Sequence, residues 1–249
     1  MSEFNKYTQK ELREKIAQAE EKYIGKGKAL FCPNHELEIY LYGYYLKEED
    51  YEIVNEPLHR MYYELALICK KRNQSENMFE YLNKAKQYNP TDIDILTDIA
   101  SEYVQIGDNE EALNTLNEMY PYIYTKRDMS MYYSLLDSCY LVKYEPETAE
   151  VLAMYSKLFC DNKQADNDLE YIASAVGRKH EKDDPAELQT YISNKNIPIQ
   201  PAPDTLGILY HTAKKQMTDG NKAYAYQLFS ALYQLTLDEE VGEILKHIK

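Results

Sequence analysis

The sequence predicts an all-α protein built as a stack of antiparallel helical hairpins. Ala, Leu, Glu, Lys and Gln are plentiful while Val is scarce, which is the composition of a helical protein. Hydrophobic residues make up 44% of the 249 residues, enough to bury a sizeable core. The 8 Gly and 9 Pro fall mostly between segments with helical apolar periodicity, where they end one helix and begin the next.

Residues 1–57 are predicted to form an atypical helical hairpin. Thr8 and Glu11 match the pattern of a capping box, which predicts a first helix from this point to about Ile24. A Pro-Asn pair then precedes a tyrosine-rich segment at 36–47, which is predicted to be the second helix.

From His59 onward a unit repeats, and the next unit begins at Ile93. Small residues at unit positions 8 and 20 allow the two helices of a hairpin to approach closely, while larger residues fill the space between hairpins. Gly107 lies at the turn of the second unit, where it permits a left-handed conformation. The residues that occupy the recurring positions of the unit are Tyr62, Leu65, Ala66, Cys69, Met78, Leu82, Ala85 and Pro90 in the first unit, and Leu96, Ile99, Ala100, Tyr103, Ala112, Leu116 and Met119 in the second.

The stretch from Ile99 to Leu113 strongly resembles the core of a tetratricopeptide repeat, and two adjacent units in register make the resemblance specific. It implies a right-handed superhelical stack of about five to six hairpins plus a C-terminal capping helix. No hairpin of such a stack buries its apolar face alone.

Two later units depart from the pattern. The unit from Ser130, after a loop through Met129, has Asp137 at the small position 8 and Tyr144 where Gly is expected. The unit from Asp166 ends in an unusual charged turn before Pro185, which is predicted to start a helix.

A clear last unit begins at Leu206, and a helix at about 239–248 would cap the array. The segment 193–205 holds three prolines and cannot be helical throughout. It is either a hinge or, as we favour, a loop packed across the array through Ile197 and Ile199. The prediction is one α-solenoid domain over 1–249, with repeat units at 58–192, this loop at 193–205, and the last unit and cap at 206–249.

The net charge of −14, from 42 acidic and 28 basic residues, repels nucleic acid and anionic membranes, so neither is expected as a partner. Four widely spaced cysteines without a CxxC pair indicate a reduced, cytoplasmic protein. No stretch has the apolar character of a signal peptide or a membrane span. The 26 Tyr suit half-buried positions, or reflect nucleotide bias in the source genome.

No motif indicates catalysis, so we expect a non-enzymatic protein without cofactor or metal. The five histidines are scattered, and Cys32 with His35 would need two further metal ligands that no motif supplies. The segment 25–28 lacks the frame of a phosphate-binding loop. Three aspartates between 92 and 98 lack the Gly and the closing Glu of a calcium loop.

The resemblance also implies which residues line the concave face, namely those at unit positions 2, 5, 9, 12 and 13. The set contains few acids, and basic groups lie at both of its ends. Such a surface suits a peptide with apolar side chains and some negative charge. The alternative is that it completes a solvated inner surface. The family's clamp for chaperone C-termini is not predicted, because Tyr63 and Leu67 replace its Lys and Asn. The predicted groove residues are Arg60, Tyr63, Leu67, Lys70, Lys71, Thr97, Ser101, Gln105, Ser134, Ser138, Arg178, Tyr210 and Lys214.

The sequence thus predicts a cytoplasmic module that binds a protein or peptide segment in this groove. One alternative is a regulatory peptide sensor, similar to the helical-repeat halves of bacterial peptide-sensing transcription regulators. Because no helix-turn-helix is recognisable, such a sensor would act through another protein. The other alternative is a self-associating scaffold, for example a homodimer.

Overall fold

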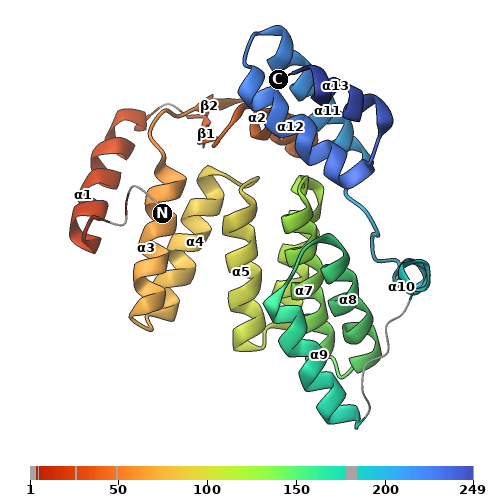
Figure 1. Ribbon diagram of the computed structural model, residues 1–249. Coiled ribbons are helices and arrows are strands. Elements are labelled where there is room, and N and C mark those ends of the chain that lie inside the picture. Colours follow the sequence, from red (N-terminus) through yellow and green to blue (C-terminus); the bar gives the residue numbers. More distant parts are fainter. Residues whose placement is uncertain (1–3, 5, 26, 49, 178–183, 249) are drawn as a thin grey trace. The chain divides into compact units, whose positions relative to one another are not determined.

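The computed structural model describes residues 1–249 except 1–3, 5, 26, 49, 178–183 and 249 (Figure 1). In that part of the chain, 13 α-helices pack against their neighbours in successive pairs and one small sheet is present, so the all-α prediction is confirmed. The contacts divide the chain into two compact units, Met1–Ile99 and Ala100–Lys249. The boundary falls inside helix α5 (Ile93–Ile106).

The first unit opens with α1 (Gln9–Glu20), which carries the predicted capping box. The Thr8 hydroxyl accepts a hydrogen bond from the Glu11 N–H, and the Thr8 N–H donates to the Glu11 carboxylate over 2.7 Å. The helix ends earlier than predicted, because a 3₁₀ turn, η1 (Glu21–Tyr23), follows it. Its buried face packs against α3 (Leu58–Lys71).

Two short parallel strands, β1 (Ala29–Phe31) and β2 (Tyr51–Ile53), were not predicted. Three residues are too few for an alternating pattern to show in the sequence. The Phe31 ring stacks on Tyr42 with 4.2 Å between centroids, and Tyr51 packs edge-on against Tyr42. This aromatic group holds α2 (Glu36–Leu46), the predicted tyrosine-rich helix, against the sheet.

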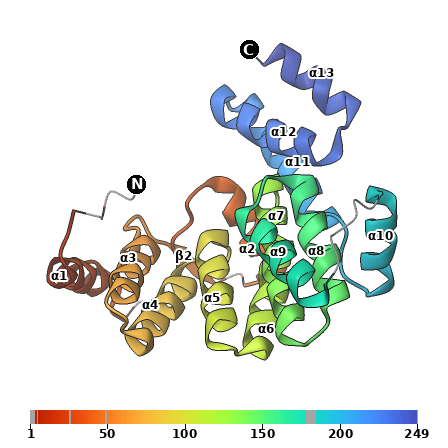
Figure 2. The same cartoon turned by 60° about the horizontal axis from the view of Figure 1, so that its bottom comes forward.

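Helices α3 and α4 (Ser75–Tyr88) form the hairpin of the first predicted repeat and lie side by side in both views (Figure 1, Figure 2). Ala66, the small residue at unit position 8, is 1% exposed, as expected where the two helices approach each other. The bulkier apolar residues Leu65 and Leu82 are also buried, so the predicted spacing places its residues in the core.

The second unit contains two clear hairpins, α7 with α8 and α11 with α12, while α10 packs against α8 and α13 against α12. Helix α7 begins before Ser130, because the Thr125 hydroxyl caps it by accepting from the Asp128 N–H. Pro185 starts α10 as predicted. The elements are α6 (Asn109–Met119), the 3₁₀ turn η2 (Tyr120–Tyr122), α7 (Lys126–Val142), α8 (Pro146–Phe159), α9 (Lys163–Val176), α10 (Pro185–Asn194), α11 (Pro203–Thr218), α12 (Lys222–Thr236) and α13 (Glu239–His247).

The proline-containing segment between α10 and α11 is held by tyrosine hydroxyls. Tyr133 of α7 donates to the Pro198 carbonyl and Tyr155 of α8 to the Ile199 carbonyl, each over 2.7 Å. The Tyr120 hydroxyl donates to the next carbonyl, that of Gln200, over 2.8 Å. Three consecutive carbonyls are therefore fixed, which favours the packed loop over the hinge.

In the described part of the chain, four turns between successive helices use one geometry at the position where the repeat expects Gly. Asn73, Gly107, Tyr144 and Gly220 all have positive φ, between 55° and 84°. At Tyr144 two hydrogen bonds close the helix end, from its own N–H to the Leu141 carbonyl and from the following N–H to the Tyr140 carbonyl. The repeat therefore imposes a left-handed residue even where the sequence supplies a tyrosine.

Replacing Tyr144 by glycine is expected to stabilise the protein. A non-glycine residue in the left-handed conformation destabilises the folded state by about 1–2 kcal/mol, and glycine removes this strain. Glycine's greater freedom in the unfolded chain cancels about half of the gain. Tyr144 is 93% exposed, so little packing is lost. We expect a gain of about 1 kcal/mol, measured by urea unfolding. Asn73→Gly is the matched control with a smaller expected gain, since Asn tolerates this conformation; a Tyr144→Gly variant less stable than the wild type would contradict the strain.

Candidate partner-binding surface

A buried polar cluster lies where α3 and α5 begin, and Asp92 is at its centre. Asp92 is 2% exposed. One carboxylate oxygen accepts from the Asp94 N–H over 3.0 Å and so caps the first turn of α5. The other accepts from the Asn34 side-chain amide over 2.8 Å and lies 3.2 Å from the Arg60 guanidinium. We call the set Asn34, Glu38, His59, Arg60, Asn89 and Asp92 the Asp92 cluster.

Glu38 of α2 is the second buried acid of the Asp92 cluster. Its carboxylate accepts from the Asn34 backbone N–H over 2.5 Å, from the Asn34 amide over 2.9 Å and from the Asn89 amide over 2.8 Å. Asn89 follows α4, so these bonds join α2 to the end of the first repeat. Amide donors thereby satisfy a charge that would be costly to bury alone.

His59 is held in the Asp92 cluster as a neutral ring. Burial lowers its pKa to about 3, with a smaller contribution from the positive charge of Arg60. Its Nε2 lies 2.9 Å from the Asn34 side-chain oxygen, which also accepts from Arg60 Nε over 3.0 Å. Because that oxygen only accepts, the proton is on Nε2. His59 therefore positions the Asn34 side chain.

Arg60 and Tyr63, the first two predicted groove residues, are bonded to acids of their own unit. Arg60 lies between Asp92 and Asp94, with Nη1 3.6 Å from the Asp94 carboxylate. The Tyr63 hydroxyl donates to Asp98 over 2.6 Å, and burial together with this contact raises the pKa of Tyr63. The positive charge of Arg60 is thus largely compensated within the chain.

The C-terminal half of α3 presents the remaining predicted residues of the first repeat to solvent. Lys70 and Lys71 are exposed in the last turn, and Leu67 is half-buried one turn earlier. Thr97 of α5 is also half-buried. Two lysines at a helix C-terminus are favoured by the helix dipole. We call Tyr63, Leu67, Lys70 and Lys71 the α3 face.

The predicted residues of the second unit differ in accessibility. Ser134 is 2% exposed, and the Ser138 hydroxyl donates to the Ser134 carbonyl over 3.1 Å. Gln105 donates to the Ser101 hydroxyl over 3.4 Å. Arg178 lies outside the described residues.

Tyr210 and Lys214 of α11 contact an acid of α13. The Tyr210 hydroxyl donates to Glu240 over 2.8 Å, and the Lys214 ammonium lies 4.0 Å from the same carboxylate and 4.4 Å from the Tyr210 ring centroid. These two predicted groove residues therefore also join α11 to the capping helix.

Asp137 of α7 is a buried acid at the position where the repeat expects a small residue. It is fully buried, and its Oδ2 has no hydrogen-bond partner among the residues that the structure describes. Burial raises its pKa to about 10, and the carboxylate of Asp168 on α9 adds to the shift. Asp137 is therefore protonated at neutral pH.

Sequence reasoning missed the Asp92 cluster, because its members come from three stretches of the chain, 34–38, 59–60 and 89–92. The one available signal was Asp92 directly before a predicted helix, which is the pattern of an N-cap. Nothing in the spacing of Asn34 or Glu38 indicated that these residues would lie in one cluster with Asp92.

Within the described residues, no group of three His, Cys, Asp or Glu side chains is placed to hold a metal ion. Burial raises the pKa of the Cys32 thiol to about 11, and Cys32, Cys69, Cys139 and Cys160 are free. In the same part of the chain, no helix has the length and apolar character needed to cross a membrane.

Comparison with known proteins identifies one repeat directly. The tetratricopeptide repeat model matches residues 59–92, which is the first unit predicted from the sequence and contains α3 and α4. No curated protein matches the chain. The matched segment contains the α3–α4 hairpin, so residues 59–92 form a tetratricopeptide repeat.

Proposed function

We propose that the protein is a non-enzymatic interaction module that binds a protein or peptide segment on the α3 face. Tetratricopeptide repeats in general mediate protein–protein interactions. The observation that carries the proposal is that the matched repeat, residues 59–92, exposes Lys70 and Lys71 at the end of its first helix. The free cysteines support a reducing, cytoplasmic location.

Charge indicates the kind of segment that would bind. The chain carries a net charge of −14, whereas the end of α3 exposes two adjacent lysines. Leu67 and the Tyr63 ring offer apolar contact next to them. A segment with an apolar side chain followed by one or two acids would complement this surface. The negative net charge argues against a nucleic-acid partner.

Reversing Lys70 and Lys71 to glutamate is expected to reduce recovery of the native partner about tenfold. Two exposed ion pairs are worth roughly 0.2–1 kcal/mol each, and the reversal adds repulsion. The measurement is quantitative capture by the tagged full chain. Arg60 is left intact, because its bonds to Asp92 and Asp94 make it part of the fold.

A matched control reverses Lys84 of α4 and Lys222 of α12, which are also exposed and carry the same total charge. Since glutamate opposes the dipole at the end of α3, a Lys70→Gln, Lys71→Gln variant and a thermal melt separate binding from stability. Equal recovery by the α3 variants and the wild type would refute the proposal. Capture of the chain by itself would indicate the self-associating scaffold instead.

A further inference from the structure

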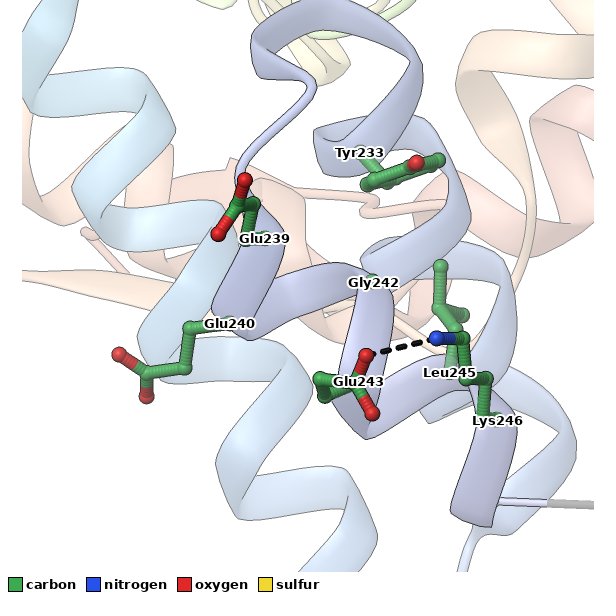
Figure 3. Close-up of a pocket in the computed structure, with 7 residues that line it drawn as sticks. All are labelled: Tyr233, Glu239, Glu240, Gly242, Glu243, Leu245 and Lys246. Atoms are coloured by element: carbon green, nitrogen blue, oxygen red, sulfur yellow. Dashed lines mark hydrogen bonds and ion pairs between the residues drawn. The ribbon is translucent and has the colours of Figure 1, made fainter.

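A cavity of about 630 Å³ opens between the last turn of α12 and the capping helix α13 in the second unit (Figure 3). Tyr233 contributes the wall from α12. Six residues of α13 line the rest: Glu239, Glu240, Gly242, Glu243, Leu245 and Lys246.

Part of the cavity is apolar. The Tyr233 ring packs so closely over α13 that a Cβ on Gly242 would lie 3.0 Å from its Cε2 atom. Tyr233 is nevertheless 38% exposed, and Leu245 is half-buried. Gly242 thus allows an aromatic face and an aliphatic side chain to share one accessible recess.

The rest of the lining is acidic, with three carboxylates and one ammonium group. Glu240 is held by Tyr210 and Lys214, as described above. Glu243 pairs with Lys246 over 2.6 Å at the surface, drawn as the dashed line in Figure 3. Glu239 is exposed, and no basic side chain in the described part of the chain pairs with it.

The neighbouring face of the same unit already shows how this chemistry binds a cation. There, the Lys214 ammonium lies over the Tyr210 ring, close to Glu240. The cavity repeats those components, an aromatic ring with carboxylates beside it, around an open space. A cation over an exposed tyrosine gains about 0.5–1 kcal/mol, and carboxylates add to this.

We propose that the cavity receives a basic segment of a partner protein. A Lys or Arg side chain of that segment lies over the Tyr233 ring between Glu239 and Glu243, and an adjacent apolar side chain contacts Leu245. Charge complementarity selects this occupant, because the lining carries a net negative charge beside its apolar wall. The surface is separate in sequence from the α3 face and does not depend on it.

The test uses the full chain and a defined probe, the peptide Ac-Ala-Leu-Arg-Arg-Leu-Ala-NH₂. The matched peptide with Gln in place of both Arg keeps its length and apolar content. The backbone amide resonance of Gly242 in NMR spectra reports binding in the cavity. Following this resonance as the peptide is added gives the Kd. We expect the Arg peptide to shift the Gly242 resonance and the Gln peptide to bind several-fold more weakly. Binding should weaken as NaCl is raised.

The variant Glu239→Gln with Glu243→Gln should raise the Kd of the Arg peptide about three- to tenfold, as expected for two exposed charge pairs. Both side chains are exposed, so the fold should be retained. The control neutralises Glu110 and Glu111, two exposed acids in the first turn of α6.

Three results would overturn the proposal. One is the absence of a Gly242 shift at millimolar Arg peptide. Another is an equal loss of affinity in the control variant, which would mean unspecific attraction to an acidic protein. The third is a Gly242 shift that depends on protein concentration without peptide, which would assign the cavity to a second copy of this chain.

Discussion

Replacing Asp92 by alanine is expected to destabilise the protein by about 3–5 kcal/mol, the range typical of breaking a buried ion pair from one side. The change removes the cap of α5 and one of the two carboxylates to which the Asn34 amide donates, and it takes the buried carboxylate away from the Arg60 guanidinium. Arg60 can turn partly to water, because its side chain is 31% exposed, so the lower half of the range is expected. Urea unfolding at pH 7 measures the loss.

Asp94→Ala is the matched control, because Asp94 also lies beside Arg60 but its side chain is 49% exposed. It should cost less than 1 kcal/mol. Asp92→Asn, which keeps the shape and the capping oxygen but loses the charge, should lie between the two. If Asp92→Ala and Asp94→Ala lower the free energy of unfolding by the same small amount, the Asp92 cluster contributes little to stability.

The repeat was predictable because its physical requirements recur at fixed spacing. Ala66 and Ala112 are small at unit positions 8 and 20, and both are buried, while Gly107 and Gly220 take the left-handed conformation at the turns. The match to residues 59–92 begins at His59, as the spacing indicated. Even Tyr144, a departure from the pattern, adopts the backbone conformation that its position requires.

The β1–β2 pair and the Asp92 cluster were not predictable in the same way. A parallel pair of three-residue strands carries no pattern of its own, and it forms where aromatic rings gather between segments. The hydrogen bond from Asn34 to Asp92 joins residues 58 positions apart. Contacts of this kind depend on tertiary structure, which periodicity within one helix does not encode.

For the candidate surface, a residue's position in the repeat predicts the face of the helix on which its side chain lies. It does not predict the charged groups that surround the side chain or how deeply it is buried. Arg60 matched a groove position, yet Asp92 and Asp94 are beside it. Ser134 matched another, yet it is 2% exposed. Lys70 and Lys71 are exposed, as a groove residue must be. Whether they bind a partner stays a prediction for the charge-reversal experiment.

Replacing Asp137 by asparagine is expected to stabilise the protein at neutral pH and to flatten its dependence on pH. The ordinary pKa of 3.8 applies in the unfolded chain, whereas burial raises the folded pKa to about 10. Between these values the unfolded chain releases a proton that the folded protein keeps. Stability therefore falls as pH rises from about 4 to about 10, by up to 1.4 kcal/mol per unit.

At pH 7 the expected gain of Asp137→Asn is a few kcal/mol, and near pH 4 it should vanish. His59 acts in the opposite direction, since its lowered pKa reduces stability as pH falls from 6.5 towards 3. The difference between variant and wild type at each pH removes that contribution. Urea unfolding at pH 4, 5.5, 7 and 8.5 gives the curve.

Two further variants separate charge from packing. Asp137→Ala places the small residue that the repeat expects and should show the same flat pH profile, with a lower stability if a cavity remains. Asp161→Asn, at an exposed position, should leave the profile unchanged. A constant difference between Asp137→Asn and the wild type from pH 4 to 8.5 would mean that Asp137 ionises alike in both states. The acid would then be reached by water, and the contact of α7 with α9 would have to open around it.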